Sequence, residues 1–141
     1  MFEIHPQLRR DCFDVGRFNL CRLLLMNDSR YPWLILVPER AGMSEIYQLP
    51  EAEQIQLMRE SCRLAQSMAT VFRADKMNVA AIGNLVPQLH IHHIVRHRDD
   101  PAWPAPVWGR FEARPYDEAG LAAVMDRIRS ALPQDCVWHA E

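Results

Sequence analysis

Apolar residues occur in this chain as short runs separated by turn-forming residues, and this pattern restricts the fold more than any other feature. The two longest runs are Leu23–Met26 and Trp33–Val37. Both are far shorter than the ~18 residues of a membrane-spanning helix, and both have the length of buried strands. Turn formers fill the Asn27–Pro32 segment between them. We therefore expect two antiparallel strands, Arg17–Met26 and Trp33–Val37, joined by a turn.

A long amphipathic helix follows these strands. Its start is indicated by Pro50 and by the acidic residues Glu51 and Glu53, which the helix dipole favours in a first turn. The apolar spacing of three and four residues ends near Phe72 or Arg73. The face predicted to contact the sheet consists of Ile55, Met58, Cys62, Ala65, Ala69 and Phe72.

Two more strands and a second helix complete the expected fold. The strands are Met77–Ile82 and Leu89–Val95, and the helix runs from Asp117 to Pro133. The apolar face of this helix comprises Leu121, Val124, Ile128 and Leu132. We predict an α+β fold in a single domain of residues 1–141. An antiparallel sheet of about five strands carries one long helix and a C-terminal helix; the core spans 17–98, and a Pro- and Trp-rich loop with a helical tail occupies 99–141.

Composition excludes several classes of partner. The chain has 141 residues, a net charge of -2 and a pI near 6.3, so it lacks the basic excess of proteins that bind long nucleic acids. Among only 5 glycines there is no phosphate-binding glycine loop, so any phosphate site must use side chains. No signal peptide or membrane span is visible, which predicts a cytoplasmic protein without a membrane partner. We expect the four cysteines, Cys12, Cys21, Cys62 and Cys136, to be reduced and mostly buried.

The chemistry is concentrated in Gln88–His97, which contains four of the six histidines. Side chains alternate along a strand, so Gln88, His90 and His92 share one face while Leu89, Ile91 and His93 share the other. Two histidines on one face lie within ~7 Å of each other, close enough to act on one phosphate or bind one metal ion. The alternation predicts that His93 faces the core or a helix.

Other polar residues leave two readings open. A metal site would use His90 and His92 with His97, Asp99 or Asp100 as a further ligand, although a strand places His97 on the opposite face. Arg96 could bind phosphate or be a solvated charge. Trp103 and Trp108 could stack on a base, but a Pro- and Trp-rich loop more often forms a packed cover or a dimer contact.

The histidine segment resembles the signature of the histidine-triad (HIT) superfamily of nucleotide hydrolases and transferases. The matching residues are Val86-Pro87-Gln88-Leu89-His90-Ile91-His92-His93-Ile94-Val95-Arg96, with Gln88 where the first histidine of the triad usually stands. Leu34–Arg40 is similar to the family strand that ends in proline and a basic residue, with Trp33 where many members have histidine. The resemblance extends from Arg17 to Arg98.

The resemblance implies a HIT-like fold and a reaction on a nucleoside monophosphate ester, anhydride or phosphoramidate. His90 matches the family's nucleophile and His92 its phosphate contact, with Gln88 as a further catalytic position. The expected substrate-binding residues are Asn84, Asp28, Asn27 and Arg96, of which Asp28 would contact ribose or else cap its own turn. No cofactor or metal is implied, and most members form homodimers. The alternative is a nucleotide-binding module of the same fold with weak or no turnover.

Overall fold

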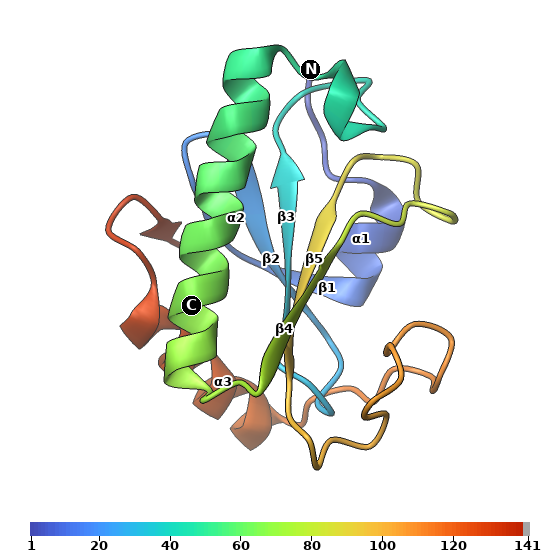
Figure 1. Ribbon diagram of the computed structural model, residues 1–141, viewed down its shortest axis with the longest axis vertical. Helices are drawn as coiled ribbons and strands as arrows, with labels where there is room; N and C mark the ends of the chain where they lie inside the picture. The colour runs from blue at the N-terminus through green and yellow to red at the C-terminus, as the bar shows by residue number, and fades with distance from the viewer. Residues whose placement is uncertain (140–141) are drawn as a thin grey trace.

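A six-stranded antiparallel sheet forms the centre of the molecule (Figure 1). The computed structural model describes residues 1–139. The sheet order is β4-β5-β3-β2-β1-β6. The elements along the chain are α1 (Pro6–Asp11), β1 (Cys12–Arg17), β2 (Cys21–Met26), β3 (Trp33–Pro38), the 3-10 turn η1 (Ile46–Gln48), α2 (Glu51–Val71), β4 (Lys76–Ala80), β5 (Ile91–Arg96), α3 (Glu118–Ala131) and β6 (Val137–Trp138). The predicted α+β class is confirmed.

Both faces of the sheet are covered, which explains why its central strands are apolar almost throughout. Every residue of β3 and β5 is buried. Helix α2 lies across one face, as Figure 1 shows, and contacts α3, β4 and β5. The opposite face is covered by the N-terminal segment, α1 and part of the loop after β5. The buried cluster on that face is Ile4, Leu8, Leu24, Tyr31, Trp33, Ile35, Val37, Val86, Ile94, Ala102 and Val107.

The first predicted strand is shorter than expected, because β2 covers only Cys21–Met26 of the predicted Arg17–Met26. Strand β1 ends at Arg17 and β2 begins at Cys21, and the turn between them is closed by the Phe18 amide, which donates to the Cys21 carbonyl over 2.7 Å. Phe18 is 2% exposed and joins the core of the helix-covered face, so an apolar residue here marks a turn rather than a continuing strand. Helix α1, β1 and β6 were not predicted because they are short and their apolar patterns are weak.

Helix α2 has the expected limits, but its predicted apolar face is only partly buried. Phe72 joins the core as expected. Ile55 and Met58 are 48% and 60% exposed, and Cys62 is also exposed. The buried residues are Leu57, Glu60, Ser61, Leu64 and Met68. The buried face of α2 differs from the predicted one for a physical reason. The Glu60 carboxylate accepts hydrogen bonds of 2.9 Å from the backbone amides of Leu20 and Cys21. A charged residue that is satisfied in this way can occupy a core position.

Helix α3 follows the prediction more closely. Asp117 is its N-cap and accepts from the Gly120 amide over 2.7 Å. Val124 and Ile128 are buried, and Leu121 and Leu132 are partly buried against the same core.

All four cysteines are free; Cys21 is buried, Cys12 and Cys136 are partly buried and Cys62 is exposed. Within residues 1–139, every helix is too short or too polar to cross a membrane.

Candidate active site

His90 and His92 lie together at the face of the sheet that α1 covers. His92 is in β5 and His90 directly precedes that strand. Their ring centroids are 4.9 Å apart, and each residue is only 6% exposed. His93 is on the opposite face and is fully buried, as the alternation predicted. The two histidines are therefore close enough to act on one small group.

The tautomer of His90 is determined by a backbone carbonyl. Its Nδ1 lies 2.7 Å from the carbonyl oxygen of Gln88. Because a carbonyl can only accept, Nδ1 must carry the proton, and in the neutral ring Nε2 keeps its lone pair. Burial lowers the pKa of His90, an effect that the Gln88 carbonyl opposes and that His5 adds to. His90 thus combines the neutral charge and the free nitrogen of a nucleophile.

His92 has the opposite tautomer, and Trp33 imposes it. The indole Nε1 of Trp33 donates to His92 Nδ1 over 2.9 Å in a buried hydrogen bond. An indole N–H cannot accept, so Nδ1 is unprotonated and Nε2 carries the hydrogen. Burial, with smaller contributions from His90 and His93, lowers the pKa of His92 to about 3. His92 is therefore a neutral residue whose Nε2–H can donate to an oxygen.

Aromatic rings surround His92 on two sides. The ring of Trp108 lies edge-on at 5.3 Å from His92 and at 6.0 Å from Trp33. Trp108 comes from the loop after β5, which we expected to act as packing, and here it packs directly against a site residue. Trp103 instead lies 5.6 Å from the guanidinium of Arg96. The sequence indicated neither the Trp33 hydrogen bond nor the Trp108 contact, because both join residues remote along the chain.

Gln88 holds the N-terminal segment. Its Oε1 accepts from the His5 backbone amide over 2.9 Å, and its Nε2 donates to the Glu3 carbonyl over 2.7 Å. One partner is a donor and the other an acceptor, which fixes the orientation of the side-chain amide. One hydrogen of Nε2 remains for a further partner. The Gln88 side chain thus binds the N-terminal segment, a role that its alignment with the first histidine of the triad did not predict.

Two histidine-strand residues form buried internal contacts. The Oγ of Ser61 lies 2.6 Å from His93 Nε2, so His93 links β5 to α2. Arg96 is 1% exposed, and its guanidinium donates to both carboxylate oxygens of Asp100, to Asn78 Oδ1 and to the Ala105 carbonyl. Arg96 therefore occupies neither of its two expected environments, and we do not include it among the proposed phosphate contacts.

The expected nucleotide contacts in the β2–β3 turn bind the chain itself. Asn27 Oδ1 accepts from the Tyr116 amide over 2.9 Å. Asp28 is 4% exposed and accepts from the Arg30 amide over 3.1 Å, which is the turn-capping alternative for this residue. Asn84 is exposed in the loop between β4 and β5. The structure therefore brings His90, His92 and Gln88 together and places Asn27 and Asp28 in a connection between the turn and the loop before α3.

Two of the three further ligands proposed for a metal site at His90 and His92 have other partners. His97 Nε2 lies 2.8 Å from the Phe72 carbonyl, and Asp100 is paired with Arg96. In residues 1–139, no group of three or more His, Cys, Asp or Glu side chains could hold a metal ion together. The geometry does not favour the metal alternative.

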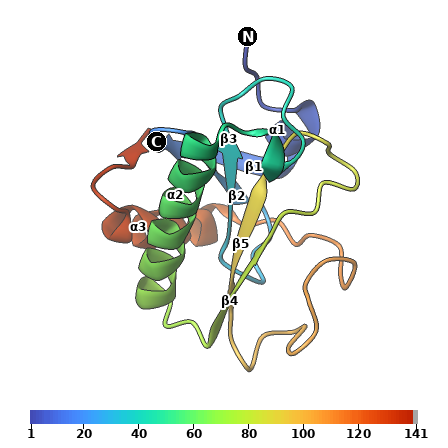
Figure 2. The ribbon, with the colours of Figure 1, turned by 45° about the horizontal axis from the view of Figure 1, so that its top comes forward.

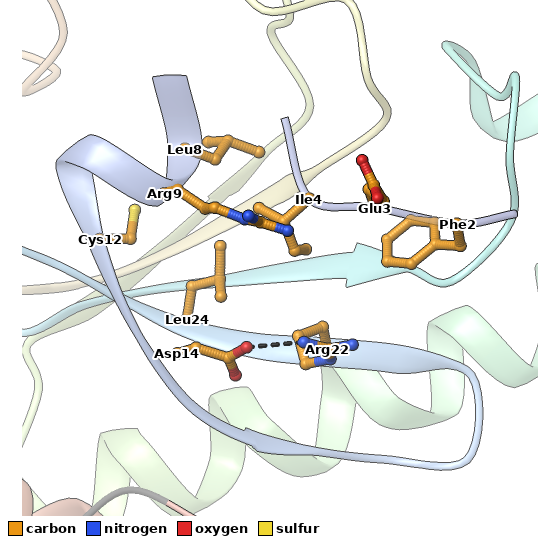
Figure 3. Close-up of a pocket in the computed structure, with 9 residues that line it drawn as sticks. All are labelled: Phe2, Glu3, Ile4, Leu8, Arg9, Cys12, Asp14, Arg22 and Leu24. Carbon is orange, nitrogen blue, oxygen red and sulfur yellow. Dashed lines mark hydrogen bonds and ion pairs between the residues drawn. The ribbon is translucent and has the colours of Figure 1, made fainter. Parts of the chain in front are cut away.

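The cavities around the site differ greatly in size. A narrow cleft of about 20 Å³ at His90 is bordered by Gly83 and Gln88. Gln88 also borders a cavity of about 500 Å³, whose other lining residues are Glu3, Ile4, His5, Pro6, Arg9 and Arg10. Figure 3 shows another cavity, of about 360 Å³, with an ion pair between Asp14 and Arg22 on one wall. Its thiol, Cys12, has a pKa raised to about 12 by burial and therefore does not form a thiolate near neutral pH.

Solved structures that are described as histidine triad proteins have folds similar to that of this chain. A histidine triad protein from Marinobacter aquaeolei VT8 is 50% identical, with a TM-score of 0.92 over 96% of this chain and 98% of that one. A histidine triad protein from Sinorhizobium meliloti 1021 is 41% identical, with a TM-score of 0.90 over 94% and 98% of the two chains. One from Bradyrhizobium japonicum is 40% identical, with a TM-score of 0.90 over 93% and 98%.

A search of curated protein sequences gives no match. The family model of the HIT domain matches residues 7–99, a stretch that includes β1 to β5, His90 and His92. With this match and the three solved structures, the chain belongs to the HIT family.

Proposed function

We propose that this HIT protein is a nucleotide hydrolase or nucleotidyl transferase that forms a covalent nucleotidyl intermediate on His90. The observation that carries the proposal is the pair of opposite tautomers, with a free Nε2 lone pair on His90 and an Nε2–H on His92. One ring can attack a phosphorus atom while the other donates to a phosphoryl oxygen. The substrate is a nucleoside monophosphate joined to a leaving group.

The reaction has two steps. In the first, His90 Nε2 forms a bond to phosphorus, and the bond from phosphorus to the leaving group breaks with the electron pair going to the leaving atom. The substituted imidazole then carries a positive charge, which the Gln88 carbonyl stabilises through Nδ1–H. In the second step, water or another acceptor attacks phosphorus, and the nitrogen–phosphorus bond breaks with its electron pair returning to Nε2. The attacking group loses its proton to solvent, and neutral His90 is restored.

His92 supports both steps without changing its protonation. Its Nε2–H can donate to a phosphoryl oxygen that gains negative charge in the transition state, and its low pKa keeps it neutral. Gln88 has one amide hydrogen left for the same purpose. We assign Asn84 as a further candidate donor, because it is exposed on the loop that leads to the histidine segment.

A nucleotide-binding protein without turnover is the second candidate, favoured by the replacement of the first triad histidine with Gln88. Rapid mixing with a nucleoside monophosphate ester of an acidic phenol separates the two candidates. An enzyme releases a burst of phenol equal to the concentration of sites, whereas a binding module releases none.

The covalent mechanism makes a prediction for His90→Ala. Turnover should be abolished and the burst lost, because the site has no substitute nucleophile. The fold should persist at lower stability, since the ring that is removed is buried. Burst amplitude, intact-protein mass and circular dichroism check the three statements. If the variant kept more than about a tenth of the wild-type kcat, a decrease of less than ~1.4 kcal/mol in transition-state stabilisation, the covalent scheme would be wrong.

A further inference from the structure

The segment before α1 is bound to the position where this chain differs from the triad. Gln88 holds it at two points, the His5 amide and the Glu3 carbonyl. In Figures 1 and 2 this segment and α1 lie beside the chain that leads into β5. The same Gln88 binds His90 Nδ1 through its backbone carbonyl. One residue thus positions both the candidate nucleophile and the backbone of another histidine.

The His5 ring has one nitrogen engaged and one open. Its Nδ1 accepts from the Gln7 amide over 3.1 Å and so caps α1. A nitrogen that accepts from an amide is unprotonated, and therefore the hydrogen of the neutral ring is on Nε2. No hydrogen bond to Nε2 is formed within residues 1–139. His5 is half-buried, and it lines the cavity of about 500 Å³ next to Gln88.

His5 is linked to His90 through Gln88, whose side chain accepts from the His5 amide over 2.9 Å while its backbone carbonyl lies 2.7 Å from His90 Nδ1. The cavity that it lines is basic, because Arg9 and Arg10 oppose the single acid Glu3. The cleft at His90 itself is only about 20 Å³. A group that leaves phosphorus needs more space, and the cavity beside His5 offers it together with positive charge.

We propose that His5 is the leaving-group-binding residue of this active site, and that it supplies from the N-terminal segment an imidazole N–H that position 88 no longer provides. The proposal rests on the proposed function above. When the bond from phosphorus to the leaving oxygen breaks, the electron pair stays on that oxygen, and His5 Nε2–H donates a hydrogen bond to it. His5 transfers no proton, because loss of Nε2–H from a ring whose Nδ1 is unprotonated would create an imidazolate.

This chemistry selects a class of substrate. Neither His5 nor Gln88 can deliver a proton, so the leaving group must be stable as an anion. Phosphoanhydrides, which release a phosphate or a polyphosphate, meet this requirement and also fit the basic cavity. Amines and simple alcohols do not, since they leave only when protonated. The site should therefore prefer nucleoside phosphoanhydrides to phosphoramidates.

His5→Asn tests the proposal without removing the helix cap, because asparagine can accept from the Gln7 amide and keeps the backbone amide that binds Gln88. The substrates are adenylyl esters of phenols of decreasing acidity. We expect kcat/KM to fall by 10- to 100-fold for the least acidic phenol and by less than about 3-fold for the most acidic one, because a donor matters most where the leaving oxygen holds the most charge. The matched control is His139→Asn, at an exposed histidine paired with Asp14, and it should leave kcat/KM unchanged for every phenol ester.

A binding measurement on the wild-type chain keeps this test separate from that of the proposed function. Imidazole NMR signals are followed during titration with AMP and with the α,β-methylene analogue of ADP. We expect the His5 signal to shift with the ADP analogue and not with AMP, which has no leaving group. An unchanged His5 signal with the ADP analogue, or an equal loss of kcat/KM across the phenols in His5→Asn, would overturn the role of His5. Absence of a burst in the wild type would instead overturn the covalent mechanism alone.

Discussion

The two imidazoles at the site differ because of the atom that each Nδ1 meets. His90 and His92 are equally buried, so burial lowers the pKa of both but cannot give them different roles. A carbonyl at one Nδ1 and an indole N–H at the other produce opposite tautomers. At the residue scale, the proposed function therefore depends on Trp33 as much as on the histidines.

Trp33→Phe tests this dependence. Phenylalanine retains most of the packing but removes the donor, so His92 can adopt the tautomer with hydrogen on Nδ1. We expect kcat to fall by about 10-fold, since part of the population loses the Nε2 donor, and the nitrogen shifts of His92 to report a mixture of tautomers.

Trp108→Phe is the matched control for Trp33→Phe. Trp108 also contacts the His92 ring, but its buried Nε1 has no partner among the described residues. Its replacement should preserve the tautomer of His92. Similar losses of kcat and similar nitrogen shifts in both variants would mean that aromatic packing, and not the hydrogen bond, controls His92.

At the scale of elements, α2 is joined to the sheet by polar contacts as well as by its apolar stripe. Glu60 holds the turn between β1 and β2, and the next residue, Ser61, binds His93 of β5. These adjacent side chains fix the rotation of α2 about its axis. They are also the reason that its apolar face differs from the one that spacing alone predicted.

His93→Ala should lower stability more than activity. Removing a fully buried ring leaves a cavity and an unpaired Ser61 hydroxyl, which together cost about 3 kcal/mol of unfolding free energy. Urea unfolding and kcat measured on the same preparation check this expectation, with Ser61→Ala as a milder control that removes only the hydrogen bond. A variant with unchanged stability and lost activity would reverse the assignment of His93 to the structural face.

At the scale of the whole molecule, buried neutral histidines make the stability of the fold depend on pH. Burial lowers the pKa of His93 from an ordinary 6.5 to about 4 and that of His92 to about 3. The unfolded chain therefore binds protons that the folded chain does not as the pH falls below 6.5. The stability associated with neutral His93 is complete above pH 6.5 and is lost progressively down to about pH 4.

Urea midpoints measured between pH 7.5 and 4.5 should show this loss. Each pKa unit corresponds to about 1.4 kcal/mol, so His93 alone accounts for up to about 3 kcal/mol over the interval. The urea midpoint should change less with pH in His93→Ala, because one of the titrating rings is absent. A midpoint that stayed constant from pH 7 to 5 would show that these rings are not buried as neutral groups.

We propose that the protein forms a homodimer, on the grounds of the exposed apolar residues of α2 and of the edge strand β4. Ile55, Met58 and Val79 are 48%, 60% and 49% exposed, and β4 is at the end of the sheet, next to β5 only. An antiparallel edge strand can pair with its own copy about a twofold axis, which would join the two sheets.

Val79→Lys should therefore shift the protein toward monomer, as measured by light scattering during gel filtration. Val137→Lys is the control, because Val137 is 62% exposed on β6 at the opposite edge of the sheet. A wild-type monomer at micromolar concentration, or a dimer that only Val137→Lys disrupts, would contradict this assignment.

The sequence by itself determined the features that depend on neighbours along the chain. Alternation in a strand assigned His90 and His92 to one face and His93 to the other, and Pro50 and Asp117 marked the starts of the two long helices. The motif around His90 indicated the family that the comparisons then established. These features have a local period or a local capping signal, so one sequence is enough to find them.

Only the tertiary structure decided which groups the site residues meet. Trp33 and His92 are 59 positions apart, and His5 and Gln88 are 83 apart, yet hydrogen bonds across these separations set a tautomer and bind the N-terminal segment. The burial of Glu60 likewise depends on partners in the distant turn between β1 and β2. A contact between remote residues leaves no periodic pattern in the chain, because its geometry exists only after the sheet and the segments covering it have assembled.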